Sequence, residues 1–196
     1  MEAEKGIKGD SSAHNLLLTA PTGAGKSLLF QLPAIYLGNE YKLLTLVVSP
    51  LKALIVDQVE ALRELGYERV AYASSDLSPE QKNEVYRRVR EGEVDLFYLS
   101  PELLLAYDIR SLIGDERKIG LIVVDEAHLV TTWGRDFRID YWYLGSYIEI
   151  LRANTNDAEH SRFVVAAFTA TAVSGGNDDM VFETINSINM NNPIKF

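Results

Sequence analysis

Apolar segments typical of β-strands alternate with segments of helical periodicity along nearly the whole chain. The predicted strands are 16–19, 44–48, 69–73, 95–99, 120–124 and 162–168, with a further one at 194–196. The predicted helices are 26–37, 51–65, 79–91, 101–113, 141–152 and 178–188. This alternation predicts an α/β fold with three layers, in which helices cover both faces of a mainly parallel sheet and ligands bind at the carboxyl ends of the strands.

The composition limits the class of protein further. A chain of 196 residues without an internal repeat or linker is expected to fold as one domain spanning 1–196. It contains no cysteine, which excludes disulfides, thiolate zinc sites and iron–sulfur clusters. No apolar run reaches the roughly 20 residues of a membrane span, and residues 1–5 lack the apolar core of a signal peptide. We therefore expect a soluble cytoplasmic protein, nucleoid-associated if it is bacterial.

The first predicted strand leads directly into Ala-Pro-Thr-Gly-Ala-Gly-Lys-Ser at residues 20–27. A strand followed by a glycine-bearing loop that opens a helix lets backbone N–H groups surround a polyphosphate. Lys26 would neutralise the terminal phosphate, and Ser27 would hold Mg²⁺. Ala20 stands where the usual pattern has its first glycine. The residues predicted to bind the nucleotide are Thr22, Gly23, Ala24, Gly25, Lys26, Ser27 and Leu28.

A second motif follows the apolar run 121–124, where Asp125 and Glu126 precede Ala127 and His128. Asp125 can orient the metal and its water shell, and Glu126 can polarise the attacking water. Either motif alone occurs by chance, but both occur here in order, each after a strand-like run. Together they predict nucleotide hydrolysis, with Glu126, Asp125 and Lys26 as the catalytic residues and Ser27 and Asp125 as metal ligands.

Two similar strand-to-helix connections are candidate contacts for a nucleic-acid backbone. Ser49, Pro50 and Leu51 follow the strand 44–48, and Ser100, Pro101 and Glu102 follow the strand 95–99. The first amides of each following helix would face the edge of the sheet where ligands bind, and could hold phosphate groups. Ser100-Pro101, like Ser78-Pro79, is also an ordinary helix start. Any strand-to-helix connection can look like these two, so each signal is weak by itself.

The segment 131–143 packs five aromatic residues and two arginines into thirteen positions. Tyr141, Trp142 and Tyr143 begin a helical pattern and are expected in the core. The rings of Trp133 and Phe137 instead lie in a polar, glycine-containing stretch, where they could stack on bases. The neighbouring Arg135 and Arg138 would add phosphate or cation–π contacts.

Taken in order, these segments resemble the first RecA-like domain of superfamily 2 helicases and, within them, the RecQ family of DNA helicases. The most specific part is 125–128 followed by Trp133-Gly134, 136–138 and Tyr141. The resemblance covers roughly residues 15 to 173 and implies a P-loop NTPase fold with ATP and Mg²⁺ as cofactors. It also implies that His128, Thr169 and Thr171 couple hydrolysis to motion, while Trp133, Phe137 and Arg138 sense single-stranded DNA.

The same resemblance implies 3'-5' movement on DNA and a second RecA-like domain, which the 196 residues do not contain. We therefore expect a fragment that binds Mg·ATP weakly and does not unwind a duplex. Arg135, Thr132 and Ile139 depart from the family pattern, which usually has histidine, glutamine and proline there. The family also reads adenine with a glutamine before the phosphate loop, whereas the first glutamine here is Gln31.

Two alternatives remain open at this point. An RNA-remodelling helicase of the same superfamily would share both nucleotide motifs. A nucleotide-dependent switch that docks a protein would suit the net charge of −9, because an evenly acidic surface repels nucleic-acid phosphates. A basic face confined to one groove, or supplied by another domain, would still permit DNA as the partner.

Overall fold

The computed structural model describes residues 2–7, 14–21, 23–128, 139–154, 163–170, 184–186, 188, 190 and 193–195. These residues form a seven-stranded sheet in the order β3-β4-β2-β5-β6-β1-β7, and all the strand pairings they make are parallel. The strands are β1 (Leu16–Thr19), β2 (Leu44–Val48), β3 (Val70–Ala73), β4 (Leu96–Leu99), β5 (Ile119–Val124), β6 (Val164–Thr169) and β7 (Ile194–Lys195). The predicted parallel α/β sheet is therefore confirmed.

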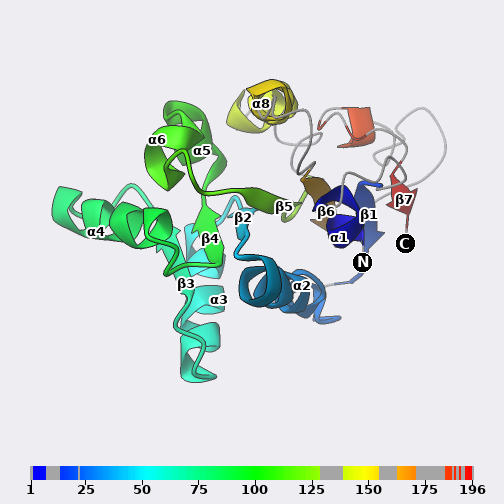
Figure 1. Cartoon of the computed structure of the whole chain (residues 1–196). Helices are drawn as coiled ribbons and strands as arrows, with labels where there is room; N and C mark the ends of the chain where they lie inside the picture. The colour runs from blue at the N-terminus through cyan, green and yellow to red at the C-terminus, as the bar shows by residue number, and fades with distance from the viewer. Residues whose placement is uncertain are drawn as a thin grey trace.

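Helices cover both faces of this sheet (Figure 1). The helices are α1 (Glu2–Ile7), α2 (Lys26–Tyr41), α3 (Lys52–Glu64), α4 (Pro79–Arg90), α5 (Pro101–Ala106), α6 (Ile109–Ile113) and α8 (Ile139–Asn154). One buried cluster joins α2 and α3 to one face of the sheet, and a second joins α4, α5, α6 and α8 to the other. The three-layer arrangement follows from these two separate cores.

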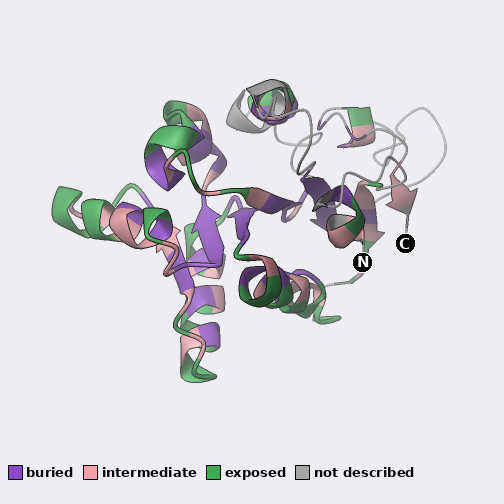
Figure 2. Ribbon diagram, viewed as in Figure 1, coloured by how far each residue is buried: buried purple, intermediate pink, exposed green. Residues whose placement is uncertain are grey.

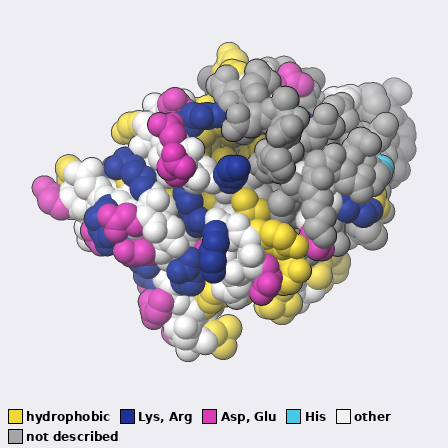
Figure 3. Space-filling model, viewed as in Figure 1, with side chains coloured by type: hydrophobic (Ala, Val, Ile, Leu, Met, Phe, Trp, Pro, Cys, Tyr) yellow, Lys and Arg dark blue, Asp and Glu magenta, His cyan; other side chains and the backbone are white. Residues whose placement is uncertain are grey.

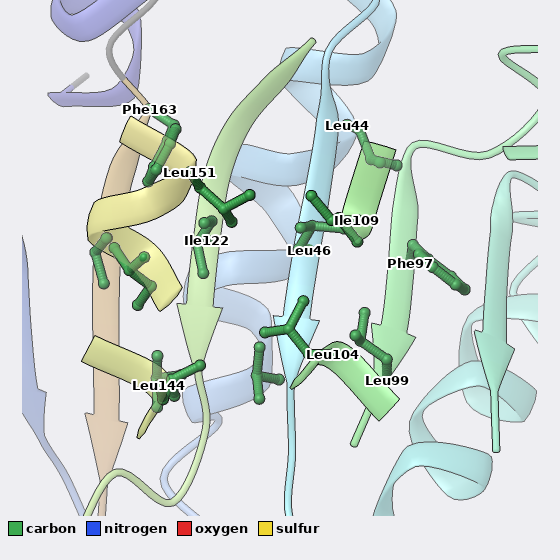
Figure 4. Close-up of a cluster of buried hydrophobic side chains, with 14 of the residues drawn as sticks. Leu44, Leu46, Phe97, Leu99, Leu104, Ile109, Ile122, Leu144, Leu151 and Phe163 are labelled. Carbon is green, nitrogen blue, oxygen red and sulfur yellow. The ribbon is translucent and has the colours of Figure 1, made fainter. Parts of the chain in front are cut away.

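The strands β2, β4, β5 and β6 are buried between the layers, whereas β1 and β7 at one edge of the sheet are more exposed, as Figure 2 shows. Their residues alternate between the two cores, as in β5, where Ile122 faces α8 and Val123 faces α2. Figure 4 shows the core under α5, α6 and α8, where Leu104, Ile109 and Leu144 meet side chains of the central strands. A sheet enclosed on both faces explains why its strands are continuous apolar runs in the sequence.

Several helices differ from the prediction in their bounds. The predicted helix 101–113 is two helices, because Tyr107 is extended and Asp108 begins a new helix by accepting a hydrogen bond from the backbone N–H of Arg110 (3.1 Å). Helix α2 continues four residues beyond the predicted end, to Tyr41. The predicted helix 178–188 lies mostly outside the described residues, and α1 was not predicted.

Helix α2 is apolar on both its sheet-facing and its outer sides. Figure 3 shows hydrophobic atoms gathered over this helix, and the exposed members are Leu28, Leu29, Leu32 and Tyr36. Among the described helices, none combines the length and the apolar character that crossing a membrane requires.

The strand order brings the two sequence motifs together. β6 lies between β1, which precedes the phosphate loop, and β5, which precedes Asp125. Because these strands are parallel, the segments that follow them emerge at one edge of the sheet.

Candidate active site

The phosphate loop connects β1 to α2. Gly23 and Gly25 have φ angles of 84° and 75°, in the left-handed region that side chains disfavour. Gly25 is the N-cap residue of α2, and because glycine has no side chain it leaves the first amides of the helix for a phosphate group. The backbone of Ala20, which replaces the usual glycine, donates to the carbonyl of Thr169 at the end of β6 (3.0 Å).

Lys26 links this loop to the acidic motif. Its Nζ donates to the carbonyl oxygen of Ala20 (3.1 Å) and lies 4.0 Å from Oε1 of Glu126. Its side chain is only 10% exposed. The ammonium group is thus placed between the phosphate loop and the predicted general base, where a terminal phosphate would need a positive charge.

Asp125 is buried at the end of β5. Its Oδ1 accepts from the backbone N–H of Glu126 (3.0 Å), and its Oδ2 accepts from the hydroxyl of Ser49 (3.5 Å). Burial, together with the nearby charge of Glu126, raises the pKa of this carboxyl, while Lys26 acts in the opposite direction. A nearby divalent cation would offset the unfavourable burial of its charge.

Glu126 has a left-handed backbone, with φ of 48°, although it is not glycine. The residues on either side explain how this conformation is maintained. The N–H of Asp125 donates to Val48 of β2 (2.9 Å), whereas the N–H of Ala127 donates to Phe168 of β6 (2.8 Å). The chain is therefore held on both sides of the strained residue, as is common at functional sites.

His128 connects the acidic motif to β6. Its Nδ1 lies 3.0 Å from Oγ1 of Thr169 and 3.4 Å from Oε2 of Glu126. Burial lowers the pKa of His128, with a smaller contribution in the same direction from Lys26. The described site thus joins the ends of β1, β5 and β6 through Lys26, Glu126, His128 and Thr169.

The predicted nucleic-acid contacts fall into four groups. Ser49, Pro50 and Pro101 are buried, so their side chains are not presented to solvent in this conformation. The hydroxyl of Ser49 is directed to Asp125 (3.5 Å), and a phosphate contact through the backbone amides of this connection stays a prediction. Ser100 caps α5 by accepting from the N–H of Leu103 (3.3 Å).

Leu51 and Glu102 are exposed at the beginnings of α3 and α5. Six of the predicted site residues lie outside the described residues: Thr22, Trp133, Arg135, Phe137, Arg138 and Thr171.

A buried amide beside the site was not predicted from the sequence. Gln31 of α2 is 6% exposed, and its Nε2 donates to the hydroxyl of Tyr98 (3.1 Å) and to Oε1 of Gln58 (3.5 Å). The available signal was a glutamine among the sheet-facing apolar positions of α2, next to Phe30.

Comparison with known proteins agrees with this geometry. Residues 4–178 match the DEAD/DEAH box helicase family, and the chain belongs to that family. It is 37% identical over 174 residues to the ATP-dependent DNA helicase Q-like 5 of Arabidopsis thaliana, covering 89% of this chain and 17% of that protein. It is 38% identical over 167 residues to the ATP-dependent DNA helicase RecQ of Bacillus subtilis, covering 85% of this chain and 26% of that protein. The predicted resemblance to RecQ helicases is confirmed.

The fold has close counterparts among solved structures. The helicase domain of Pyrococcus furiosus Hef aligns with 99% of this chain and 36% of that one, with a TM-score of 0.63 and 22% identity. The DUF1998 helicase MrfA, solved with DNA and AMPPNP, aligns with 100% of this chain and 26% of that one, with a TM-score of 0.68 and 17% identity. These likenesses confirm the RecA-like architecture. The chain spans only about a quarter or less of the first curated relatives it matches.

Proposed function

We propose that this chain is the ATP-binding domain of an ATP-dependent DNA helicase that couples ATP hydrolysis to movement on single-stranded DNA. The observation that carries the proposal is the convergence of Lys26, Glu126, His128 and Thr169 at the carboxyl ends of three adjacent strands. The similarity to proteins named as RecQ DNA helicases supports DNA, rather than RNA, as the polymer. A site of action in the cytoplasm, or at the nucleoid of a bacterium, belongs to the same proposal.

The residues divide the chemistry among them. The amides at the start of α2 and the ammonium of Lys26 bind the phosphates of ATP and neutralise the terminal one. Glu126 orients a water molecule and accepts its proton as the water attacks the terminal phosphorus and the bond from that phosphorus to the bridging oxygen breaks, releasing ADP and phosphate. His128, hydrogen-bonded to Thr169, positions Glu126 through Oε2, whereas Lys26 approaches Oε1.

The side chains present fit Mg²⁺. Ser27 offers a hydroxyl and Asp125 a buried carboxylate, and Mg²⁺ binds through few protein oxygens together with phosphate and water. When bound, the ion would neutralise charge on the phosphates. Ser49 and the backbone N–H of Glu126 hold the Asp125 carboxylate through hydrogen bonds.

Movement along DNA would also use a second domain and residues of this chain outside the described part. We propose that 1–196 is the first domain of a two-domain core, and that a second RecA-like domain supplies an arginine to the transition state. The segment containing Trp133, Arg135, Phe137 and Arg138 would report single-stranded DNA to the adjoining acidic motif. Thr171 would act with Thr169 in this coupling, and movement would run in the 3'-5' direction.

The proposal is tested by measuring steady-state ATP hydrolysis by the full-length protein that contains this chain. The rate is compared without nucleic acid, with single-stranded DNA and with single-stranded RNA. We expect strong stimulation by DNA, and loss of the rate in Lys26→Ala. Lys118→Ala is the matched control, because Lys118 is an exposed lysine just before β5, at the opposite end of that strand from Asp125.

The other outcomes identify the alternatives. Stimulation chiefly by RNA would indicate an RNA-remodelling enzyme. A rate indifferent to both polymers would indicate a nucleotide-dependent switch that docks a protein. A rate that survives Lys26→Ala would contradict the assignment of the nucleotide site itself.

A further inference from the structure

An ion pair joins the segments that follow β2 and β3, two strands that are not neighbours in the sheet. Lys52, the first residue of α3, donates through Nζ to Oδ2 of Asp76, which stands shortly after the end of β3. The strand order places β4 between β2 and β3. Because two strand spacings amount to about 9–10 Å, the side chain of Lys52 reaches across the carboxyl end of β4.

The carboxylate of Asp76 is held in place for this contact. Its other oxygen, Oδ1, accepts from the hydroxyl of Ser74 (2.8 Å), and Ser74 is buried at the end of β3. The hydrogen bond from Lys52, followed by the one from Ser74, lowers the pKa of Asp76. Asp76 therefore presents a fixed anion to Lys52, at the edge of the sheet where ligands bind.

The same edge is the predicted path of a nucleic-acid backbone. Lys52 directly follows Leu51 of the first predicted contact, and it crosses the end of β4, where the second begins at Ser100. Both side chains of the ion pair are 52% exposed, so a phosphate group from solvent can reach the ammonium group. An ammonium group binds carboxylate and phosphate alike. Asp76 thus occupies the position that a phosphate would take.

The densest run of basic residues, on α4, is already occupied by acidic side chains. Arg87 is paired with three glutamates, and Arg88 shares one of them. Those charges are neutralised within α4 and the turn after it. A chain with a net charge of −9 needs positive charge at the ligand-binding edge to bind DNA, and Lys52 provides it once Asp76 is displaced.

We propose that Asp76 is an intramolecular competitor of single-stranded DNA: its carboxylate occupies Lys52 in the free protein, and a DNA phosphate replaces it when DNA binds. This inference rests on the proposed function, because DNA is the ligand in both. An exposed ion pair contributes little stability, so it exchanges readily for another anion. Asp76 therefore weakens DNA binding modestly, and its removal has the opposite effect from removal of the lysine.

The experiment measures binding of a fluorescent single-stranded oligothymidylate to the full-length protein at several salt concentrations. Asp76→Asn keeps the shape of the side chain and removes the competing charge. We expect its Kd to fall about two- to fivefold at low salt. Lys52→Gln should raise the Kd about threefold or more. It should also reduce the slope of log Kd against log salt by about 0.7, because one phosphate contact is lost.

Asp115→Asn and Lys118→Gln are the matched controls. Both residues are exposed just before β5, at the opposite end of the sheet from Asp76. Each control changes the net charge by the same amount as the variant it matches. Because salt screens distant charges, each should change the Kd by less than about 1.5-fold.

The double variant separates competition from a general effect of charge. Once Lys52 is replaced, Asp76 no longer withholds a cation from DNA. Adding Asp76→Asn to Lys52→Gln should therefore leave the Kd within about 1.5-fold of Lys52→Gln alone. An equal gain in both backgrounds would show that Asp76 acts only as a distant negative charge, and would overturn the inference. A Kd that Asp76→Asn leaves unchanged or raises would overturn it as well.

Failure of the proposed function gives a different result. If the unaltered protein bound no single-stranded DNA, DNA would not be its ligand, and the proposed function and this inference would both fail. If it bound DNA and Asp76→Asn did not bind more tightly, this inference alone would fail.

Discussion

The Nδ1 atom of His128 lies 3.0 Å from the hydroxyl oxygen of Thr169, and this contact ties the acidic motif to the end of β6. The carbonyl of the same threonine accepts from the N–H of Ala20 in the phosphate loop (3.0 Å). Thr169 therefore touches both halves of the candidate active site, one through its side chain and the other through its backbone. A small movement of β6 would be transmitted to both.

Replacing Thr169 by valine removes the hydroxyl and retains the branched shape. Because the backbone contact with Ala20 does not depend on the side chain, we expect ATP affinity to stay within about twofold, while DNA-stimulated hydrolysis falls at least tenfold, an activation free energy of about 1.4 kcal/mol. Both are measured in the full-length protein. A parallel loss of affinity would mean that the hydroxyl serves the phosphate loop instead.

Changing Glu126 to glutamine should abolish turnover and spare ATP binding. The substitution keeps the size of the side chain but removes the proton acceptor, whereas the phosphate loop and Lys26 are untouched. Single-turnover hydrolysis and equilibrium binding are compared in the same preparation. Retained turnover would show that another group accepts the proton.

Much of this architecture was predictable because each strand is a continuous apolar run. The bounds of β1 and β2 agree with the prediction residue for residue, since Thr19 and Val48 stand directly before polar or proline-containing turns. The helix starts after Ser78 and Ser100 were predictable because serine before proline is a local capping signal, and both hydroxyls accept the expected backbone hydrogen bonds.

Other features depend on residues distant in the sequence. The hydrogen bond between Ser49 and Asp125 spans 76 positions, so nothing near Ser49 in the sequence indicates it. The hydrogen bond between Gln31 and Tyr98 spans 67 positions and exists only once α2 lies on β4. Nothing local to Glu126 indicates its positive φ, which results from hydrogen bonds of its two neighbours to different strands.

The stability of the chain should depend on the protonation of His128. Its pKa is lowered from 6.5 in the folded state, chiefly by burial, so the unfolded chain binds the proton more readily. The stability contribution of neutral His128 is therefore complete above the unfolded pKa of about 6.5 and is lost as the pH falls below it. Urea midpoints of the chain and of His128→Gln should diverge in that range. Parallel pH profiles would contradict this expectation.

The far end of the sheet supplies a test of packing that is independent of the nucleotide. Asp95 is fully buried just before β4, where it accepts hydrogen bonds from Arg69 (2.6 and 2.8 Å) and from the hydroxyl of Tyr67 (2.9 Å). Gly38 of α2 lies against this carboxylate, and a Cβ atom there would be 2.2 Å from Cγ of Asp95. A side chain at position 38 would therefore displace a charge that three hydrogen bonds hold in place.

Gly38→Ala should accordingly lower the free energy of unfolding by about 1–3 kcal/mol, the usual cost of overpacking. The better helix propensity of alanine, about 1 kcal/mol, reduces this loss without reversing it, because breaking the contacts of a buried charge is costly. Asn39→Ala, at the next and exposed position, controls for the helix term and should not destabilise. The free energies of unfolding of both variants are measured by urea denaturation. If Gly38→Ala were as stable as Asn39→Ala, Asp95 would move without a loss of stability. Its ion pair with Arg69 would then contribute little to the stability of the fold.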